Sequence, residues 1–264
     1  MTPPPALGAA VAAIADDPAG ADAPGGRAQV IDELRSRIRG MQKRSLEARV
    51  LPTSSALADL LPGGALAAGS SYAVENSTTL ALEMLAGPSG AGSWCAIVGM
   101  PDLGAEAAAE AGIDLARLVL VPHPGDQWMA VVSALVDVIP VVLVNPPMRD
   151  GRARVNDAAA SRMAARLRQR EAVLIGVGDW PGAEARLRVA ESGWSGIGAG
   201  FGRLAARRVT VASASAAWAG RGRSRRLWMP GVDGRVAAVT PWGAEEAAGP
   251  GVEAPGVIPF SAAG

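Results

Sequence analysis

Five short, continuously apolar runs recur through the middle of this chain, separated by segments with helical spacing. The runs lie at residues 70–75, 94–99, 118–121, 141–144 and 172–177. Strands that are apolar on both faces are typical of a parallel sheet that helices cover on each side. The alternation therefore predicts an α/β fold with three layers, in which a mostly parallel sheet lies between helices.

The segments between these runs carry apolar residues at helical spacing. The expected helices cover residues 78–86, 103–111, 126–138 and 156–170. The pair Gly87-Pro88 is a typical stop signal, so we expect the first of these helices to end there. A short helix followed by a Gly-rich turn is expected within residues 50–69.

After Trp180 the period of the apolar residues changes from that of a helix to two. Alternation with a period of two predicts antiparallel strands, which here extend the sheet and leave one face wetter. These strands are expected at residues 185–190, 207–212 and 226–229, with a Gly-rich link at 193–202.

The two ends of the chain differ in composition from its middle. Residues 1–26 and 240–264 are rich in Pro, Ala and Gly, so we expect a disordered segment and a flexible tail. Residues 27–49 predict a basic amphipathic helix, and residues 50–239 form the expected core domain. Neither a signal peptide nor an apolar run of the ~20 residues needed to span a bilayer is apparent, which predicts a cytoplasmic protein.

The turn after the first apolar run has the layout of a phosphate-binding loop without its chemistry. The strand ends at Glu75, passes through Asn76 and Ser77, and becomes a helix that opens on Thr78 and Thr79. A working loop needs glycines whose backbone N–H groups surround the phosphates, and a Lys for the outer phosphate. This turn contains neither, and Glu75 adds a negative charge. The residues therefore predict a degenerate nucleotide site.

Over residues 50–230 the order of elements resembles the RecA core. The run at 94–99 resembles the strand that carries RecA's catalytic Glu, but Met100 and Pro101 stand near that position. The run at 141–144 resembles the Walker B strand, whose metal-supporting Asp falls at Asn145. An amide lacks the negative charge that supports the Mg²⁺ shell. The resemblance therefore implies a relative of an ATPase that is not an enzyme, with no metal and no cofactor.

The runs at 118–128 and 178–182 are similar to the actinobacterial ImuA-prime type, within the ImuA and SulA group. The resemblance implies a non-catalytic accessory factor of the damage-inducible (SOS) translesion mutasome. Its implied partners are ImuB, a Y-family polymerase homologue, and indirectly the DnaE2-type polymerase and the sliding clamp. Two alternatives stay open: a SulA-like cell-division inhibitor, which would have a shorter chain, and a divergent DNA-dependent ATPase.

Basic residues supply the candidate contact surfaces. Residues 1–150 carry nine basic and sixteen acidic side chains, whereas residues 151–264 carry sixteen basic and nine acidic ones, so the second half suits an anionic partner. The loop at 148–155 is a candidate for weak DNA contact, and a mixture of Arg and Trp suits a protein interface. An ordinary solvated surface and the oligomeric state stay open. The candidates are Arg35, Arg39, Lys43, Arg149, Arg152, Arg154, Arg221, Arg223, Arg225, Arg226 and Trp228.

His123 and Cys95 are the only residues of their types, which excludes a Cys/His metal site and an internal disulfide. His123 lies between two prolines just after an apolar run, and we expect a structural role in a loop. Cys95 lies within an apolar run, where a thiol behaves as a small core residue.

Overall fold

The computed structural model describes residues 49–149, 152–153, 155–198, 201–239 and 258–259. The expected disordered segment at 1–26 lies outside these ranges. The expected basic helix at 27–49 lies outside them except for its last residue, and the expected tail at 240–264 lies outside them except for 258–259.

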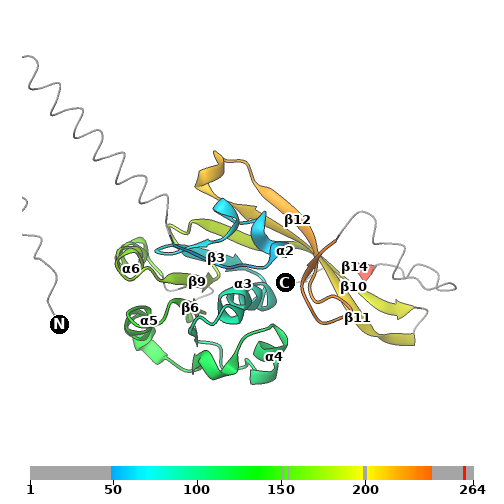
Figure 1. Cartoon of the computed structure of the whole chain (residues 1–264), viewed down its shortest axis with the longest axis horizontal. Coiled ribbons are helices and arrows are strands. Elements are labelled where there is room, and N and C mark those ends of the chain that lie inside the picture. Colours follow the sequence, from blue (N-terminus) through cyan, green and yellow to red (C-terminus); the bar gives the residue numbers. More distant parts are fainter. Residues whose placement is uncertain (1–48, 150–151, 154, 199–200, 240–257, 260–264) are drawn as a thin grey trace, which may run out of the picture. The chain divides into compact units, whose positions relative to one another are not determined.

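A ten-stranded sheet forms the centre of the described chain (Figure 1). Its strand order is β13-β12-β11-β10-β3-β9-β6-β4-β5, and β14 pairs with β10 beside this path. Adjacent strands from β10 to β5 are parallel. These strands are β3 (Ser71–Glu75), β4 (Cys95–Val98), β5 (Leu118–Val121), β6 (Val141–Val144), β9 (Val173–Val177) and β10 (Ala185–Gly198).

Antiparallel strands extend this sheet beyond β10. They are β11 (Phe201–Ala214), β12 (Arg223–Trp228) and β13 (Ala237–Ala238), and β14 (Ile258–Pro259) pairs with β10 in the same sense. The prediction of an α/β fold, with a mostly parallel sheet and antiparallel C-terminal strands, is confirmed.

Helices cover the parallel part of the sheet on both faces. The helices α2 (Ser55–Ala58), α3 (Thr78–Gly90) and α4 (Ala105–Glu110) contribute to one apolar cluster. The helices α5 (Trp128–Val136) and α6 (Asp157–Arg170) contribute to the other. No helix within the described residues is both long enough and apolar enough to cross a membrane.

Short elements complete the described chain. Single 3₁₀ turns occur at Pro62–Gly64, Leu115–Arg117, Gly125–Gln127 and Ala216–Trp218. Two small antiparallel sheets of two strands each lie outside the main sheet, and the sequence did not predict them. They pair β1 (Val50–Leu51) with β2 (Leu66–Ala67), and β7 (Met148–Arg149) with β8 (Arg152–Ala153).

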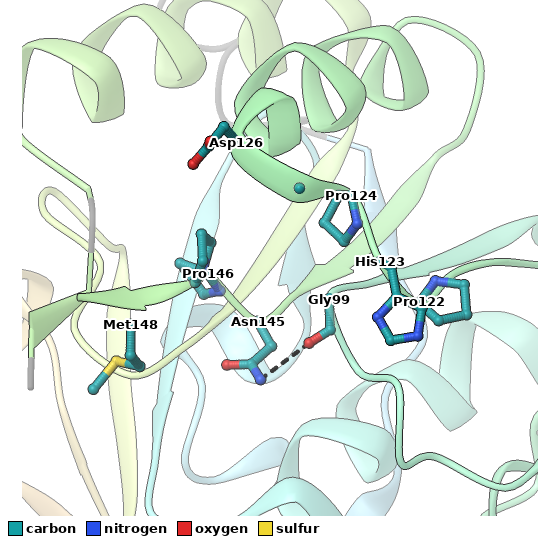
Figure 2. Close-up of a pocket in the computed structure, with 10 residues that line it drawn as sticks. Gly99, Pro122, His123, Pro124, Asp126, Asn145, Pro146 and Met148 are labelled. Carbon is teal, nitrogen blue, oxygen red and sulfur yellow. Dashed lines mark hydrogen bonds between the residues drawn. The ribbon is translucent and has the colours of Figure 1, made fainter.

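The carboxyl ends of the parallel strands are tied to one another by backbone and side-chain hydrogen bonds (Figure 2). The backbone N–H of Asn145 donates to the carbonyl of Val98 at 2.9 Å, and the Asn145 side-chain amide donates to the carbonyl of Gly99 at 3.2 Å. Gly99 has a φ of 77°, and a Cβ atom there would lie 2.3 Å from the Asn145 carbonyl oxygen. The ends of β4 and β6 therefore meet at a distance that only glycine allows.

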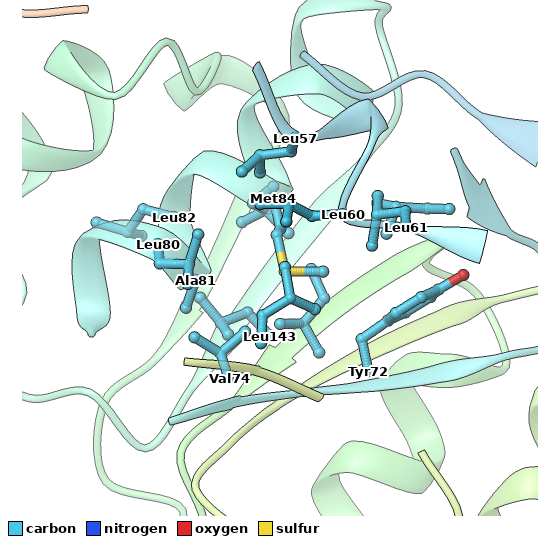
Figure 3. Close-up of a cluster of buried hydrophobic side chains, with 14 of the residues drawn as sticks. Leu57, Leu60, Leu61, Tyr72, Val74, Leu80, Ala81, Leu82, Met84 and Leu143 are labelled. Carbon is cyan, nitrogen blue, oxygen red and sulfur yellow. The ribbon is translucent and has the colours of Figure 1, made fainter. Parts of the chain in front are cut away.

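The larger apolar cluster lies between β3 and the helices α2 and α3 (Figure 3). Tyr72 and Val74 of β3 are fully buried against Leu80 and Met84 of α3. The Tyr72 hydroxyl accepts a hydrogen bond from the backbone N–H of Ala67 at 2.8 Å, so its polar end is satisfied. Burial raises the pKa of Tyr72 to about 12. This packing fixes the direction in which α3 leaves β3.

The expected end of the first helix at Gly87-Pro88 is wrong, because α3 continues to Gly90 with Pro88 inside it. A Cβ atom on Gly87 would lie 2.6 Å from the carbonyl oxygen of Pro52. Gly87 therefore serves the close approach of a neighbouring backbone and does not terminate the helix. Beyond it, the hydroxyl of Ser89 accepts a hydrogen bond from the backbone N–H of Asp114 at 2.9 Å, which holds the last turn in place.

The expected Gly-rich link at 193–202 is also wrong, because β10 and β11 pair through most of it. The register continues to the pair Gly198 and Phe201, with an irregularity between Ser195 and Ile197. Gly196 has a φ of 106°, and a Cβ atom there would lie 2.2 Å from the carbonyl oxygen of Arg203. At least this glycine belongs to a bulge inside a long hairpin, where its backbone needs the space.

Candidate functional site

The connection between β3 and α3 consists of Asn76 and Ser77 alone. Asn76 turns the chain with a left-handed φ of 59°. The hydroxyl of Ser77 accepts a hydrogen bond from the backbone N–H of Leu80 at 3.1 Å, and so caps α3. A phosphate-binding loop places several residues, two of them glycines, between its strand and its helix. Two residues are too few to surround a phosphate, and one N–H group of the helix end is already used by Ser77.

Charges of both signs lie beside this turn. Glu75 is the last residue of β3, and Arg188 of β10 is its partner in the parallel register. Glu75, Arg186 and Arg188 line a shallow hollow of about 310 Å³ beside the turn. A carboxylate at the end of the strand repels a phosphate, whereas the two guanidinium groups attract one. The sequence did not identify the two arginines as neighbours of the turn, because strand order decides that contact.

Asn145 lies at the rim of a different pocket, of about 490 Å³, at the carboxyl ends of β4, β5 and β6 (Figure 2). None of the residues 75–79 lines this pocket, and β9 lies between β3 and β6 in the sheet. The amide of Asn145 is directed at the Gly99 carbonyl. The residues expected to form one degenerate nucleotide site are therefore divided: Asn145 ties two strand ends, and Glu75 to Thr79 form a separate turn.

His123 and Asp126 also line this pocket, in the loop after β5. The side chain of His123 is exposed at the pocket rim. Among the described residues, no group of three His, Cys, Asp or Glu side chains is arranged to hold a metal ion.

The arginines expected to form one basic interface near Trp228 are divided between the two faces of β12. Arg225 forms an ion pair with the carboxylate of Asp59 at the end of α2, and Arg223 donates to the Asp59 carbonyl at 3.0 Å. Arg223 also lies 4.3 Å from the centre of the Trp218 ring, within the range of a cation–π contact. These two arginines therefore fasten β12 to α2.

Arg226 lies on the opposite face of β12, since neighbouring residues of a strand point to opposite sides. Trp228 shares this face and is half-buried. Arg221 is exposed in the loop before β12 and lines a hollow with Arg186. The remaining predicted contacts are not tested by the structure. Arg149 and Arg152 lie in the β7–β8 hairpin, and Arg35, Arg39, Lys43 and Arg154 lie outside the described residues.

A buried acidic group lies on α3, away from the turn. Glu83 is only 8% exposed, and burial raises the pKa of its carboxyl above the usual value. It lines a pocket of about 620 Å³ with Ser54, whose buried hydroxyl lies close enough to the Glu83 carboxyl to offset part of this rise. This carboxyl was not predicted from the sequence, because the pattern of residues 78–86 is typical of an ordinary apolar helix.

Residues 59–182 match the family model described as the MT3502 N-terminal domain. The chain is also 35% identical over 166 residues to the uncharacterized protein Rv3395c of Mycobacterium tuberculosis, an alignment that covers 62% of this chain and 78% of that protein. Among solved structures, it is similar to the crystal structure of the RadB recombinase, with 16% sequence identity and a TM-score of 0.49. That similarity covers 71% of this chain and 98% of the RadB chain.

Proposed function

The chain belongs to the family of Rv3395c and the MT3502 N-terminal domain, and we propose that it is a RecA-like protein that has lost ATP hydrolysis. Its working parts are then its surfaces, which contact other proteins. In the more specific form of this proposal it is the ImuA-prime-type accessory factor of a damage-inducible translesion mutasome, as its resemblance to that group implies.

The observation that carries the proposal is the two-residue connection between β3 and α3. Phosphoryl transfer depends on a backbone cradle, a Lys and a supported Mg²⁺ ion. Here Asn76 and Ser77 provide no cradle, and the side-chain amide of Asn145 donates its hydrogen bond to the Gly99 carbonyl. The loss of a single such group typically lowers transition-state stabilisation by ~3–4 kcal/mol, so the combined loss supports the proposal that the chain does not hydrolyse ATP.

The first test is a calorimetric titration of the full chain with ATP and Mg²⁺, together with an assay of phosphate release in the presence of DNA. We expect neither binding in the micromolar range nor turnover above the buffer control. Micromolar affinity that depends on Mg²⁺ would overturn the proposal and favour the divergent DNA-dependent ATPase.

The proposed protein partner is the ImuB-type polymerase homologue, and the region expected to contact it is the antiparallel part of the sheet. Exposed large apolar side chains there support this role, because such residues form the centres of protein interfaces. Leu204 of β11 is 51% exposed, and Val232, in the turn after β12, is 80% exposed.

The second test is co-purification of ImuB with the full chain and with Val232→Asp. A matched control is available in Val138→Asp, since Val138 follows α5 and is 77% exposed, close to the 80% of Val232. We expect Val232→Asp to reduce the recovered ImuB several-fold and Val138→Asp to leave it unchanged. Equal recovery with both variants would place the interface elsewhere, and no recovery with the unmodified chain would refute the proposed partner.

A further inference from the structure

Positive charge is concentrated in one part of the sheet, the extension formed by β10 to β13. Residues 185–239 carry ten arginines and two acidic residues, a formal net charge of +8. Residues 49–184, which include the parallel strands, carry nine arginines and fourteen acidic residues, a net charge of −5. A separation of this size directs an anionic partner to the extension.

Because side chains alternate along a strand, several of these arginines lie on the same face of the sheet. On β10, β11 and β12 the residues Leu187, Val211 and Leu227 are buried in the cluster under α2. Their neighbours point to the other side of the sheet. We call this second side the arginine face; it carries Arg186, Arg188, Arg208 and Arg226.

Cross-strand pairing brings these residues close together. Ala212 of β11 is paired with Arg188 on one side and with Ser224 on the other, while Thr210 is paired with Arg226. Residues paired in this way have Cβ atoms ~5 Å apart. Small and hydroxyl-bearing residues therefore separate the arginines and leave their guanidinium groups accessible.

The arginine face is exposed where the helices end. On the parallel strands this side of the sheet is covered by α5, α6 and Trp180, whose ring packs on Gly176. Beyond Trp180 the side chains of Arg188, Arg208 and Arg226 are exposed. Figure 1 shows β10 to β12 extending away from α5 and α6.

Arg188, Arg208 and Arg226 have no ion-pair partner within the described ranges. Arg186 differs, because it forms an ion pair with Asp179 and donates to the carbonyl of Trp180 at 2.9 Å.

Two carboxylates also lie on the arginine face. Glu191 accepts a hydrogen bond from the hydroxyl of Thr210 at 2.9 Å, and Glu75 lies beside Arg188 in the register. Three guanidinium groups thus remain free to bind an anion.

The chemistry of the arginine face favours a nucleic acid over an acidic protein. Stable protein interfaces need large apolar anchors at their centre, with charge at the rim. Here the centre consists of Thr210, Ala212 and Ser224. The large apolar side chains described on this face, Leu204 and the half-buried Trp228, lie toward one end of it. Arginines interspersed with hydroxyl groups are the side chains that contact phosphate oxygens without reading a base sequence.

We infer that the arginine face binds the phosphate backbone of a nucleic acid, independently of base sequence. This inference goes beyond the protein-binding role proposed above, and it does not depend on the identity of a protein partner. It also differs from the expected weak DNA contact at the loop 148–155, which is a separate part of the chain.

The test is fluorescence anisotropy of the full chain with one oligonucleotide, as a labelled single strand and as a duplex, between about 50 mM and 200 mM salt. The variant Arg188→Gln/Arg226→Gln removes two free charges from the arginine face. The control Arg162→Gln/Arg168→Gln removes two exposed arginines from α6. Both variants change the net charge equally, so a difference between them reports location. Arg188→Lys/Arg226→Lys keeps the charge and tests whether the substitution itself disturbs the strands.

We expect log K for the unmodified chain to fall linearly with log salt. The Gln double variant should lower the slope by about 1.4 for the single strand or about 1.8 for the duplex, since each phosphate contact contributes about 0.7 or 0.9. The Lys variant should keep most of the slope, and the α6 control should keep all of it. Tighter binding of one oligonucleotide form at the same salt concentration identifies that form as the preferred ligand.

Three results would overturn the inference. The first is no binding of either oligonucleotide at the lowest salt concentration. The second is an equal loss of slope in the α6 control, which would mean that net charge alone is responsible. The third is salt-sensitive self-association of the chain in sedimentation without DNA that the Gln variant abolishes, because the arginine face would then bind the acidic part of a second copy.

Discussion

Substitution of Gly99 by alanine tests whether the close approach of β4 and β6 organises the carboxyl edge of the sheet. Gly99 follows β4 with a φ of 77°, and a Cβ atom there would lie 2.3 Å from the Asn145 carbonyl oxygen. Gly178 follows β9 with a φ of 87°, but a Cβ atom there would meet nothing within 4 Å. The two glycines therefore share a backbone conformation and differ in the space around them.

The expected costs follow from this difference. A left-handed conformation destabilises an L-residue by ~1–2 kcal/mol. Replacing Gly by Ala also lowers the conformational entropy of the unfolded chain, which stabilises the folded state by ~0.4–1 kcal/mol, so Gly178→Ala should destabilise by about 1 kcal/mol. Gly99→Ala adds a backbone clash, which is worth a further ~1–3 kcal/mol because the Asn145 strand end must move. That movement also lengthens the bond from the Asn145 N–H to the Val98 carbonyl. We expect a total of about 3 kcal/mol for Gly99→Ala.

Urea unfolding of both variants, followed by far-UV circular dichroism, measures these free energies. Gly99→Ala should shift the midpoint about three times as far as Gly178→Ala, with an unchanged slope. Equal shifts would show that φ alone matters and that the strand ends are free to separate. The reasoning about the Gly99–Asn145 contact would then be refuted.

Three further predictions concern α3 and its neighbours. Ser77→Ala should lower the free energy of unfolding by about 1 kcal/mol, because Leu80 loses its cap, and Ser77→Asp should restore it in the same urea titration. Glu83→Gln should be more stable than the unmodified protein at neutral pH and should lose this advantage at acid pH. Burial raises the pKa of Glu83, so the unmodified protein loses stability as pH rises from the ordinary value of 4.5 through the raised pKa, and the Gln variant does not. Thermal unfolding of both proteins at acid and neutral pH would contradict this if their difference stayed constant. Cys95 should react with a thiol reagent only after unfolding, since burial raises its pKa to about 11; rapid labelling of the native chain in a mass spectrum would argue against that.

The sequence predicted the sheet well, because each parallel strand is a continuous apolar run bounded by a turn. The runs at 94–99 and 141–144 became β4 (Cys95–Val98) and β6 (Val141–Val144), with boundaries shifted by a residue or less at most ends. The predicted helix end at Gly87 was wrong. Glycine is needed there because the backbone of Pro52, 35 residues earlier in the chain, approaches too closely for a Cβ atom. Such contacts leave no mark in the local pattern.

The candidate sites could be predicted only in part. The sequence alone shows that positions 76 and 77 are neither Gly nor Lys. The length of the connection became known only from the structure, where β3 ends at Glu75 and α3 begins at Thr78. The arginine face was missed, because it depends on which strands are neighbours of β10. The alternation at 185–190 placed Arg186 and Arg188 on one side, and the same alternation separates Arg225 from Arg226.

The short connection between β3 and α3 has an evolutionary consequence. Point substitutions at Asn76 and Ser77 exchange side chains but add no backbone, so glycine and lysine at these positions would still leave the chain too short to enclose a phosphate. Hydrolysis would require an insertion at this turn, together with a new acidic group at Asn145. On the proposal that this chain has lost ATP hydrolysis, a return to that chemistry needs several simultaneous changes, whereas the surfaces can diversify one substitution at a time.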